Sequence, residues 1–337
     1  MNLFRTSSTL ILIAGILAVA GCSSHTSTST NINASAAADI YLTNQTSGGG
    51  SQTPQVLGIS ATGSSGATIS TVNGPAGDTF LGLASDSSGN LFTVDKAAAG
   101  GAYTVDEFAA GTNSSGTSAS TTIRTFTSTA INAVPIGLKV DGSGDIFVML
   151  TGGAVLRFAT GATGAVTPSA SLTGSSGVMT TDSSGNLYVT TPISLTDNHS
   201  AIAVYSSGFA TGAVAQRTIL PATEMSITSL AVDSSGNIYA TGKDINSNID
   251  VAVFAAAATG TSTATRVISG ANTDLVNPWQ VQVDGAGNVF VADSTTGASG
   301  GTVVVSQFAS TASGNIGPAS RVTTSATYAA TSAMTIH

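Results

Sequence analysis

The feature that most constrains this chain is a unit that recurs five times without gaps at its centre. Each unit has an apolar stretch, an Asp-x-x-Gly turn and a second apolar stretch: LGLASDSSGNLFTVD (81–95), IGLKVDGSGDIFVML (136–150), GVMTTDSSGNLYVTT (177–191), TSLAVDSSGNIYATG (228–242) and WQVQVDGAGNVFVAD (279–293). The turn-opening residues Asp86, Asp141, Asp182, Asp233 and Asp284 are spaced by 55, 41, 51 and 51 residues. A period of this size predicts propeller blades or a comparable array.

Each unit predicts a short β-hairpin followed by two more strands. The Asp-Ser-Ser-Gly segment fits a type I turn followed by a residue at positive φ, which glycine adopts without strain. The Asp side chain is expected to accept hydrogen bonds from the turn amides. A third strand ends on an aromatic residue, as in 251–254, and a fourth short strand follows, as in 266–268. Four strands are the content of one propeller blade. Four of the predicted outer strands carry an arginine for which we predict a structural bond and no function, to a neighbouring-blade carbonyl or a turn aspartate: Arg124, Arg217, Arg266 and Arg321.

The two ends of the chain settle the number of blades. Residues 39–42 match residues 90–93, so the chain enters a sixth unit at its second strand. Its third and fourth strands are expected at 55–59 and 67–72, and residues 332–336 supply the missing first strand. The prediction is an all-β, six-bladed β-propeller of four-stranded blades over residues 39–337, in which the C-terminal strand completes the N-terminal blade and leaves no open junction.

These units resemble NHL-type propeller repeats, whose pattern is an apolar strand, Asp-x-x-Gly-Asn, Ile-Tyr-Val-Ala-Asp, a loop and Val-x-Val-Phe. The resemblance covers residues 39–337, and it specifies a fold more than a function. It implies that the first strand of each blade lines the axis. It also implies that ligands bind at the face carrying the loops between strands two and three and the connections between blades, which we name the loop face.

The N-terminal segment predicts export and lipid attachment. Residues 1–21 contain Arg5 and the apolar run LILIAGILAVAG, which is too short for a spanning helix. The run ends in Val19-Ala20-Gly21-Cys22, which resembles a bacterial lipobox in which Cys22, the sole cysteine, is lipidated. An ordinary signal peptide with a chance cysteine is the alternative. Residues 22–38 are expected to form a flexible tether.

The composition and the N-terminal segment together indicate in which compartment the protein resides and which classes of partner it binds. Charged residues make up only 8% of the chain, against about 25% in typical soluble proteins. The net charge is −8 without a basic stripe, which argues against nucleic acid as a partner. We expect a bacterial cell-envelope protein held at the membrane through lipidated Cys22. Ser23 in place of a retention aspartate favours the outer membrane, and a monomer is expected.

Candidate ligand-binding residues gather on the expected loop face. They are Asp95, Lys96, His199, Glu224, Lys243, Asp244, Trp279 and Asp293, with Asp197, Asn198 and Asn277 beside them. Trp279 is either a stacking platform for a sugar or peptide at the channel mouth, or a residue packed between blades. Asp95 and Asp293 end equivalent second strands, so they are either ligand contacts or turn caps. This pattern favours a non-enzymatic binding or assembly platform for an envelope protein or glycan.

Two other functions stay open. The first is a metal-assisted lyase or lactonase at the channel mouth, which requires Asp197, His199 and Glu224 to converge; the six-bladed relatives implied by the resemblance include streptogramin lyase and gluconolactonase-like enzymes. The second is an inert surface or structural protein. The DSSGN turns offer one Asp each, too few carboxylates for the six to eight oxygen ligands of calcium. We therefore expect plain hairpins, no metal and no cofactor.

Overall fold

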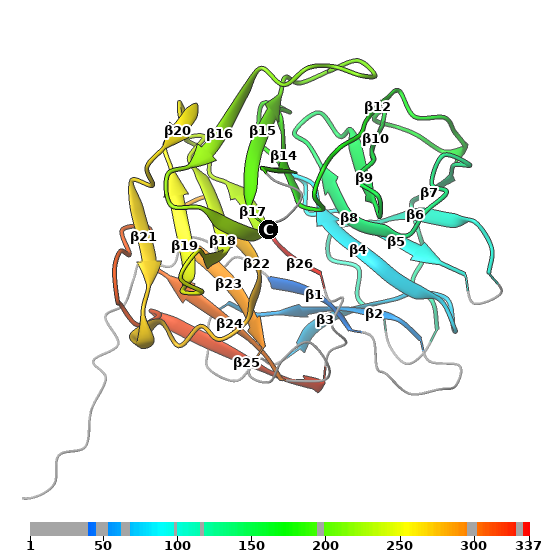
Figure 1. Cartoon of the computed structure of the whole chain (residues 1–337). Coiled ribbons are helices and arrows are strands. Elements are labelled where there is room, and N and C mark those ends of the chain that lie inside the picture. The colour runs from blue at the N-terminus through cyan, green and yellow to red at the C-terminus, as the bar shows by residue number, and fades with distance from the viewer. Residues whose placement is uncertain are drawn as a thin grey trace, which may run out of the picture. The chain divides into compact units, whose positions relative to one another are not determined.

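The computed structural model describes residues 40–44, 53–61, 68–97, 100–114, 118–193, 199–294, 302–327 and 333–337. These residues belong to one compact unit, 35–337. Within them, the chain forms six sheets arranged as propeller blades around a common centre, as Figure 1 shows. Among the described residues, there is no helix with the length and hydropathy needed to cross a membrane.

Blade 1 joins the two ends of the described chain. Its strands, in spatial order from the centre, are β26 (Met334–Ile336), β1 (Ile40–Asn44), β2 (Gln55–Ile59) and β3 (Thr68–Asn73). Strand β26 pairs antiparallel with β1, with Ile40 opposite Ile336 and Leu42 opposite Met334. The predicted closure of the ring by the C-terminal strand is therefore confirmed.

Blades 2 to 6 each contain an antiparallel meander of four strands. Blade 2 has β4 (Thr79–Ser85), β5 (Leu91–Lys96), β6 (Tyr103–Phe108) and β7 (Arg124–Thr127). Blade 3 has β8 (Pro135–Val140), β9 (Ile146–Leu150), β10 (Val155–Phe158) and β12 (Ala170–Leu172). Blade 4 has β13 (Met179–Thr181), β14 (Leu187–Pro192), β15 (Ser200–Tyr205) and β16 (Arg217–Pro221). Blade 5 has β17 (Met225–Val232), β18 (Ile238–Asp244), β19 (Ile249–Phe254) and β21 (Arg266–Ser269). Blade 6 has β22 (Pro278–Val283), β23 (Val289–Ser294), β24 (Thr302–Phe308) and β25 (Ser320–Thr327), preceded by a 3-10 turn, η1 (Ala271–Thr273).

Short segments also connect consecutive blades at their outer edges. Strand β11 (Gly164–Ala165), from blade 3, pairs in parallel with β7 of blade 2, and β20 (Gly260–Ser262), from blade 5, pairs with β16 of blade 4. An isolated bridge joins Ile268 of blade 5 to Gly314 of blade 6. These short strands pair with part of the outer edge of each blade, whose unpaired backbone groups would otherwise favour aggregation. They were not predicted from the sequence.

The hairpin turns have the predicted geometry. Gly89 has a φ of 81°, and the equivalent glycines of the other four units lie between 81° and 82°. In blade 2, Asp86 Oδ1 accepts the amides of Ser88 and Asn90, both at 2.9 Å, and Asn90 Nδ2 donates to Asp86 Oδ2 at 2.9 Å. Both carboxylate oxygens thus accept hydrogen bonds from donors of the turn itself, as predicted for the aspartate of the hairpin.

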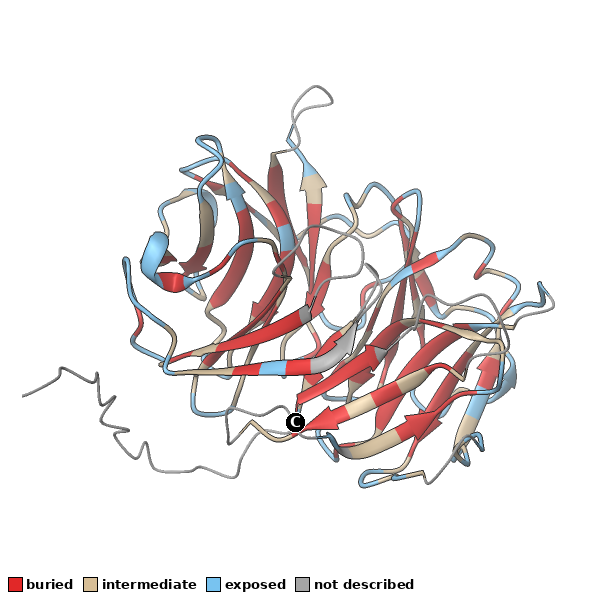
Figure 2. Cartoon of the chain, turned by 90° about the horizontal axis from the view of Figure 1, so that it is seen from below, coloured by how far each residue is buried: buried red, intermediate tan, exposed pale blue. Residues whose placement is uncertain are grey.

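The core lies between the blades, where Figure 2 shows buried residues along the strands. The aromatic residues that end the third strands are largely buried. The rings of Phe126 in blade 2 and Phe158 in blade 3 pack in a tilted arrangement with centroids 4.9 Å apart. Arginines join neighbouring blades: Arg217 Nη1 donates to Ala258 O at 2.6 Å and Arg266 Nη1 donates to Ala312 O at 2.8 Å. The predicted bonds to neighbouring-blade carbonyls are confirmed for these two. Arg124 pairs with Glu107 and Arg321 with Asp274 instead.

Candidate functional site: the central channel and the loop face

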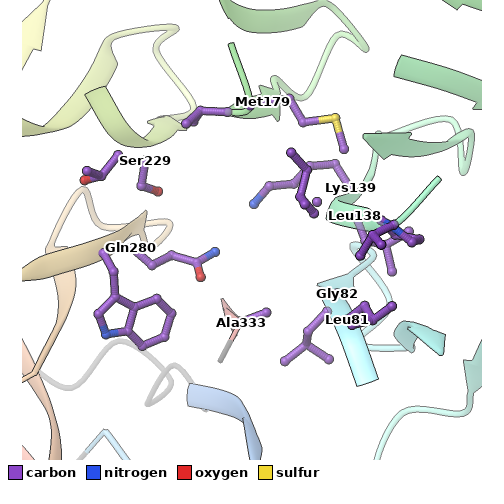
Figure 3. Close-up of a pocket in the computed structure, with 17 residues that line it drawn as sticks. Leu81, Gly82, Leu138, Lys139, Met179, Ser229, Gln280 and Ala333 are labelled. Atoms are coloured by element: carbon purple, nitrogen blue, oxygen red, sulfur yellow. The ribbon is translucent and has the colours of Figure 1, made fainter. Parts of the chain in front are cut away.

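A cavity of about 320 Å³ lies at the centre of the ring, in contact with all six blades (Figure 3). The first strands of blades 2 to 6 line it, together with Ala333, which directly precedes β26. The wall is mostly apolar, with Leu81, Leu138 and Met179 among its side chains. Cavities of about 300–1,000 Å³ with apolar walls and a few polar groups are typical of small-molecule sites.

Trp279 packs between blades, as one of the two alternatives predicted, and it also reaches the cavity wall; stacking on a ligand stays a prediction. Its side chain lines the cavity, and it also packs partly buried against the core shared by blades 6 and 1, which includes Phe290 and Met334. An indole in this position offers an apolar surface to the channel and stays fixed by its packing.

Most polar groups of the wall are engaged in bonds between blades. The Gln280 carboxamide donates from Nε2 to Met334 O and accepts from Met334 N, both at 2.9 Å. Ser229 Oγ accepts the Val281 amide at 3.1 Å. These groups hold adjacent first strands together, so they are not free to bind a ligand without loss of an existing bond.

Lys139 differs from the other channel residues. Among the described residues that line the cavity, it is the one titratable side chain, and it has no ion pair or side-chain hydrogen bond. Figure 3 shows its amine directed into the space enclosed by the first strands. Lys139 is half-buried in the channel wall, and this partial burial lowers its pKa to about 8, because the ammonium loses part of its hydration there without gaining a counter-charge.

A second hollow of about 160 Å³ continues the channel toward the hairpin turns. Ser85, Thr180, Gln282 and Thr335 line it, and Lys139 lines both hollows. The amine therefore stands at the junction between a largely apolar space on the loop-face side and a polar space on the hairpin side.

The structure brings two of the predicted loop-face residues together. His199, at the start of β15, places Nδ1 3.0 Å from Glu224 Oε2 in the connection before β17. The Glu224 side chain is half exposed. Asp197 and Asn198, predicted to lie beside them, fall outside the described residues, as does Cys22.

Asp95 lies in a buried acidic cluster. It is 3% exposed at the end of β5 and shares a side-chain hydrogen bond with Asp78, which precedes β4. Burial, reinforced by the charges of Asp106 and Asp78, raises the pKa of Asp95 to about 8. Burial and Asp78 also raise the pKa of Asp106, on β6, to about 6. Close carboxyl groups in a shielded place resist joint ionisation.

Asp293, at the equivalent position of blade 6, has a different environment. It is 1% exposed, and its carboxylate accepts the Val276 amide at 2.8 Å and the Asn277 amide at 2.6 Å. Asp293 therefore caps the connection between blades 5 and 6, which is the turn-cap role, one of the two roles predicted for it. Asp244 similarly caps its own turn, because its Oδ1 accepts the amides of Asn246 and Asn248, both at 2.8 Å.

The remaining candidates are exposed lysines. Lys243 is exposed at the end of β18, and Lys96 places its Nζ 5.7 Å from the centroid of the Tyr103 ring. Of the predicted residues that the structure describes, Trp279 lines the channel cavity. Ligand contact by any of them stays a prediction.

Sequence reasoning missed Lys139, Gln280 and the partners of Asp95. A signal for Lys139 was present in the repeat: two residues before the turn Asp, the other units carry the neutral Ala84, Thr180, Ala231 and Gln282. A single lysine among these residues marks an exception on the innermost strand.

No group of three or more His, Cys, Asp or Glu side chains arranged to hold a metal ion occurs among the residues that the structure describes. The convergence required by the lyase or lactonase hypothesis is therefore limited, in this part of the chain, to the His199–Glu224 pair.

Comparisons with known proteins agree with the fold. A family model described as "Beta-propeller repeat" matches residues 216–249, which contain β16 and the whole first hairpin of blade 5, β17 and β18. The sequence has no significant match among curated proteins. The WD40 domain of Toxoplasma gondii coronin is similar at 12% identity with a TM-score of 0.51, over 85% of this chain and 68% of that one. A Bacteroides caccae protein of unknown function is similar at 7% identity with a TM-score of 0.51, over 88% of this chain and 98% of that one. These likenesses establish a β-propeller with a propeller-type repeat.

Proposed function

We propose that this protein is a lipid-anchored envelope protein, in the outer membrane, whose propeller binds a partner protein at the loop face without catalysing a reaction. The observation that carries the proposal is a set of exposed apolar residues in the connections of four consecutive blades on this face: Val134, Ile193, Ile245 and Val276. Exposed apolar side chains grouped around one opening are typical of protein interaction sites. The recurrence of an Asp-x-x-Gly turn in five blades, followed by Asn in four of them, supports kinship with NHL-type repeats.

Site-specific photo-crosslinking in intact cells tests the binding proposal. A benzoylphenylalanine is placed at Ile245 or Val276 of the full-length chain, and at Val214 as the control. Val214 is 89% exposed and lies in the connection between β15 and β16, on the hairpin side. A discrete crosslinked protein is expected from the two loop-face positions and not from Val214. Equal crosslinking from all three would overturn the proposal, and a carbohydrate adduct would replace the protein partner with a glycan.

The anchor is tested separately, because it rests on residues 19–22 of the sequence. Cells fed an alkyne fatty acid should label the wild-type chain and leave the Cys22→Ser chain unlabelled. The labelled protein should sediment with outer-membrane vesicles, whereas Cys22→Ser should leave that fraction. A labelled Cys22→Ser chain would exclude this attachment site.

The second candidate function is a metal-assisted lyase or lactonase, and the His199–Glu224 contact at 3.0 Å is the observation that favours it. Imidazole and carboxylate are common metal ligands. Crystals grown with Mn²⁺ and examined by anomalous scattering test it. A peak within coordination distance of both side chains, lost in Glu224→Gln, would support the enzyme.

A further inference from the structure

The half-buried side chain of Lys139 lies in the wall of both hollows, and none of the described residues gives its ammonium a counter-charge. An ammonium removed from water without a counter-charge is unfavourable, and burial accordingly lowers the pKa of Lys139 to about 8. The packing of the ring does not need a lysine here, because the equivalent positions carry neutral residues: Ala84, Thr180, Ala231, Gln282 and Thr335. An unpaired amine kept in a cavity is understood most simply as one half of a binding contact.

The surroundings of Lys139 supply no substitute for a counter-charge. Strand β4 presents Ala84 and Ser85 to this part of the channel, and β13 presents Thr180 and Thr181. From across the channel come neutral side chains, Gln282 and Thr335. The closest carboxylate along the strand, Asp141, belongs to the hairpin turn, where its Oδ1 accepts the amides of Ser143 and Asp145. Desolvation is the sole cause of the lysine's shift, so no neighbouring charge acts on it appreciably.

The channel also fixes the kind of partner that Lys139 can take. The space of about 320 Å³ beside the amine is bounded by Leu81, Leu138, Met179 and the Trp279 indole, so it favours an apolar body. The polar side chains Gln280 and Ser229 are already bonded to backbone groups, which leaves one free cationic donor. One positive charge and apolar walls match a monoanion, whereas a phosphate dianion needs more donors.

We propose that the central channel is a binding site for a small organic acid, whose carboxylate pairs with the Lys139 ammonium and whose apolar body fills the space beside Trp279. Binding restores the counter-charge that the amine lacks. This site is distinct from the exposed residues of the loop face, and it stands whether or not a partner protein docks there.

The pairing predicts a coupling between binding and protonation. A carboxylate favours the charged amine, so the pKa of Lys139 rises from about 8 in the free protein when the acid binds. Affinity is therefore constant between the pKa of the acid, about 4, and about pH 7, and it falls as the pH rises through about 8. At pH 9, about a tenth of the free protein carries the ammonium, so affinity is about tenfold lower than at pH 7. Binding at pH 9 takes up a proton, and binding at pH 6.5 does not.

Calorimetry on the full-length, detergent-solubilised protein tests this, with benzoate as the probe and benzyl alcohol as its neutral counterpart. Benzoate should bind, benzyl alcohol should bind at least tenfold more weakly, and Lys139→Met should lose benzoate binding by at least tenfold. Lys139→Arg should bind benzoate equally at pH 7 and pH 9, because arginine stays charged. Lys243→Met, which alters an exposed lysine, and Ile245→Asp, which alters the loop face, should leave benzoate binding unchanged.

Three outcomes would overturn the proposal. They are no benzoate binding at millimolar concentration, equal affinity for acid and alcohol, and full binding by a folded Lys139→Met chain. Thermal unfolding of each variant verifies folding, and Lys139→Met should melt at or above the wild-type temperature at pH 7, since it removes a partly desolvated charge without a counter-charge. If benzoate binds as expected but the photo-crosslinking at Ile245 and Val276 captures no protein, the loop-face partner is rejected and the channel site stands.

Discussion

The carboxamide of Gln280 makes a two-bond clasp on the backbone of Met334, donating to its carbonyl oxygen and accepting from its amide, both at 2.9 Å. Gln280 belongs to the last blade, and Met334 begins the strand that completes the first. The clasp therefore fixes the closing strand from the side opposite its pairing with β1. A ring whose final junction is bonded on two sides has no free edge at its centre.

Replacing Gln280 by leucine should destabilise the fold. The change leaves the Met334 amide without this acceptor and leaves the Met334 carbonyl with the 3.3 Å bond from Gln282 Nε2, and an unmade buried hydrogen bond costs about 1–3 kcal/mol. Thermal and urea unfolding should both shift downward. Gln216→Leu is the matched control, because the Gln216 side chain is exposed and forms no hydrogen bond with the described residues. Equal stability of the two variants would show that the clasp is dispensable.

Deleting residues 328–337 should open the ring. The deletion removes β26, and with it the buried Met334 side chain, which is 0% exposed. Strand β1 would then expose the edge that now pairs with β26. We expect a lower melting temperature, a broader transition and concentration-dependent association, measured by calorimetry and light scattering. An unchanged melting temperature would contradict the role of the closing strand.

Asp95→Asn should make the fold more stable at pH 8 and flatten its pH dependence. The folded-state pKa of Asp95 is raised to about 8, above the unfolded value of about 3.9, so the folded chain binds this proton more tightly. Its contribution is fully present below about pH 4 and is lost as the pH rises through about 8. One pKa unit corresponds to about 1.4 kcal/mol, so the gain at pH 8 should exceed about 1 kcal/mol. Urea unfolding at pH 5, 6.5 and 8 measures it.

Asp293→Asn should have the opposite effect at pH 8. Burial raises the pKa of Asp293 as well, but the amides of Val276 and Asn277, which donate to its carboxylate, oppose that shift. Asparagine has one acceptor oxygen, so one of these buried amides loses its partner, and an unmade buried hydrogen bond costs about 1–3 kcal/mol. We expect this loss to exceed the gain from removing a buried charge, with a net destabilisation of about 1 kcal/mol in the same urea series. A destabilised Asp95→Asn together with a neutral Asp293→Asn would show that the two environments have been assigned the wrong way round.

The comparison of Asp95 with Asp293 shows where prediction from sequence reached its limit. Both residues end the second strand of a repeat, and the same two roles, ligand contact or turn cap, were predicted for both. Their environments differ because the partner comes from the connection between blades, which does not repeat: a carboxyl of Asp78 in one case, and the amides of Val276 and Asn277 in the other. The His199–Glu224 contact also depends on a connection that does not repeat, since His199 precedes β15 of blade 4 and Glu224 lies in the connection from blade 4 to blade 5.

The sequence by itself determined the architecture of the ring. The Asp-x-x-Gly hairpins, the blade number and the closing strand follow from local turn chemistry and period-2 patterning, both of which act over a few residues. Only the tertiary structure decided the chemistry of the centre. Lys139 lost part of its hydration, and Gln280 reached a residue 54 positions away, because ring closure brought six first strands around one axis. Desolvation and contacts between distant segments depend on that closed packing, and no single repeat contains them.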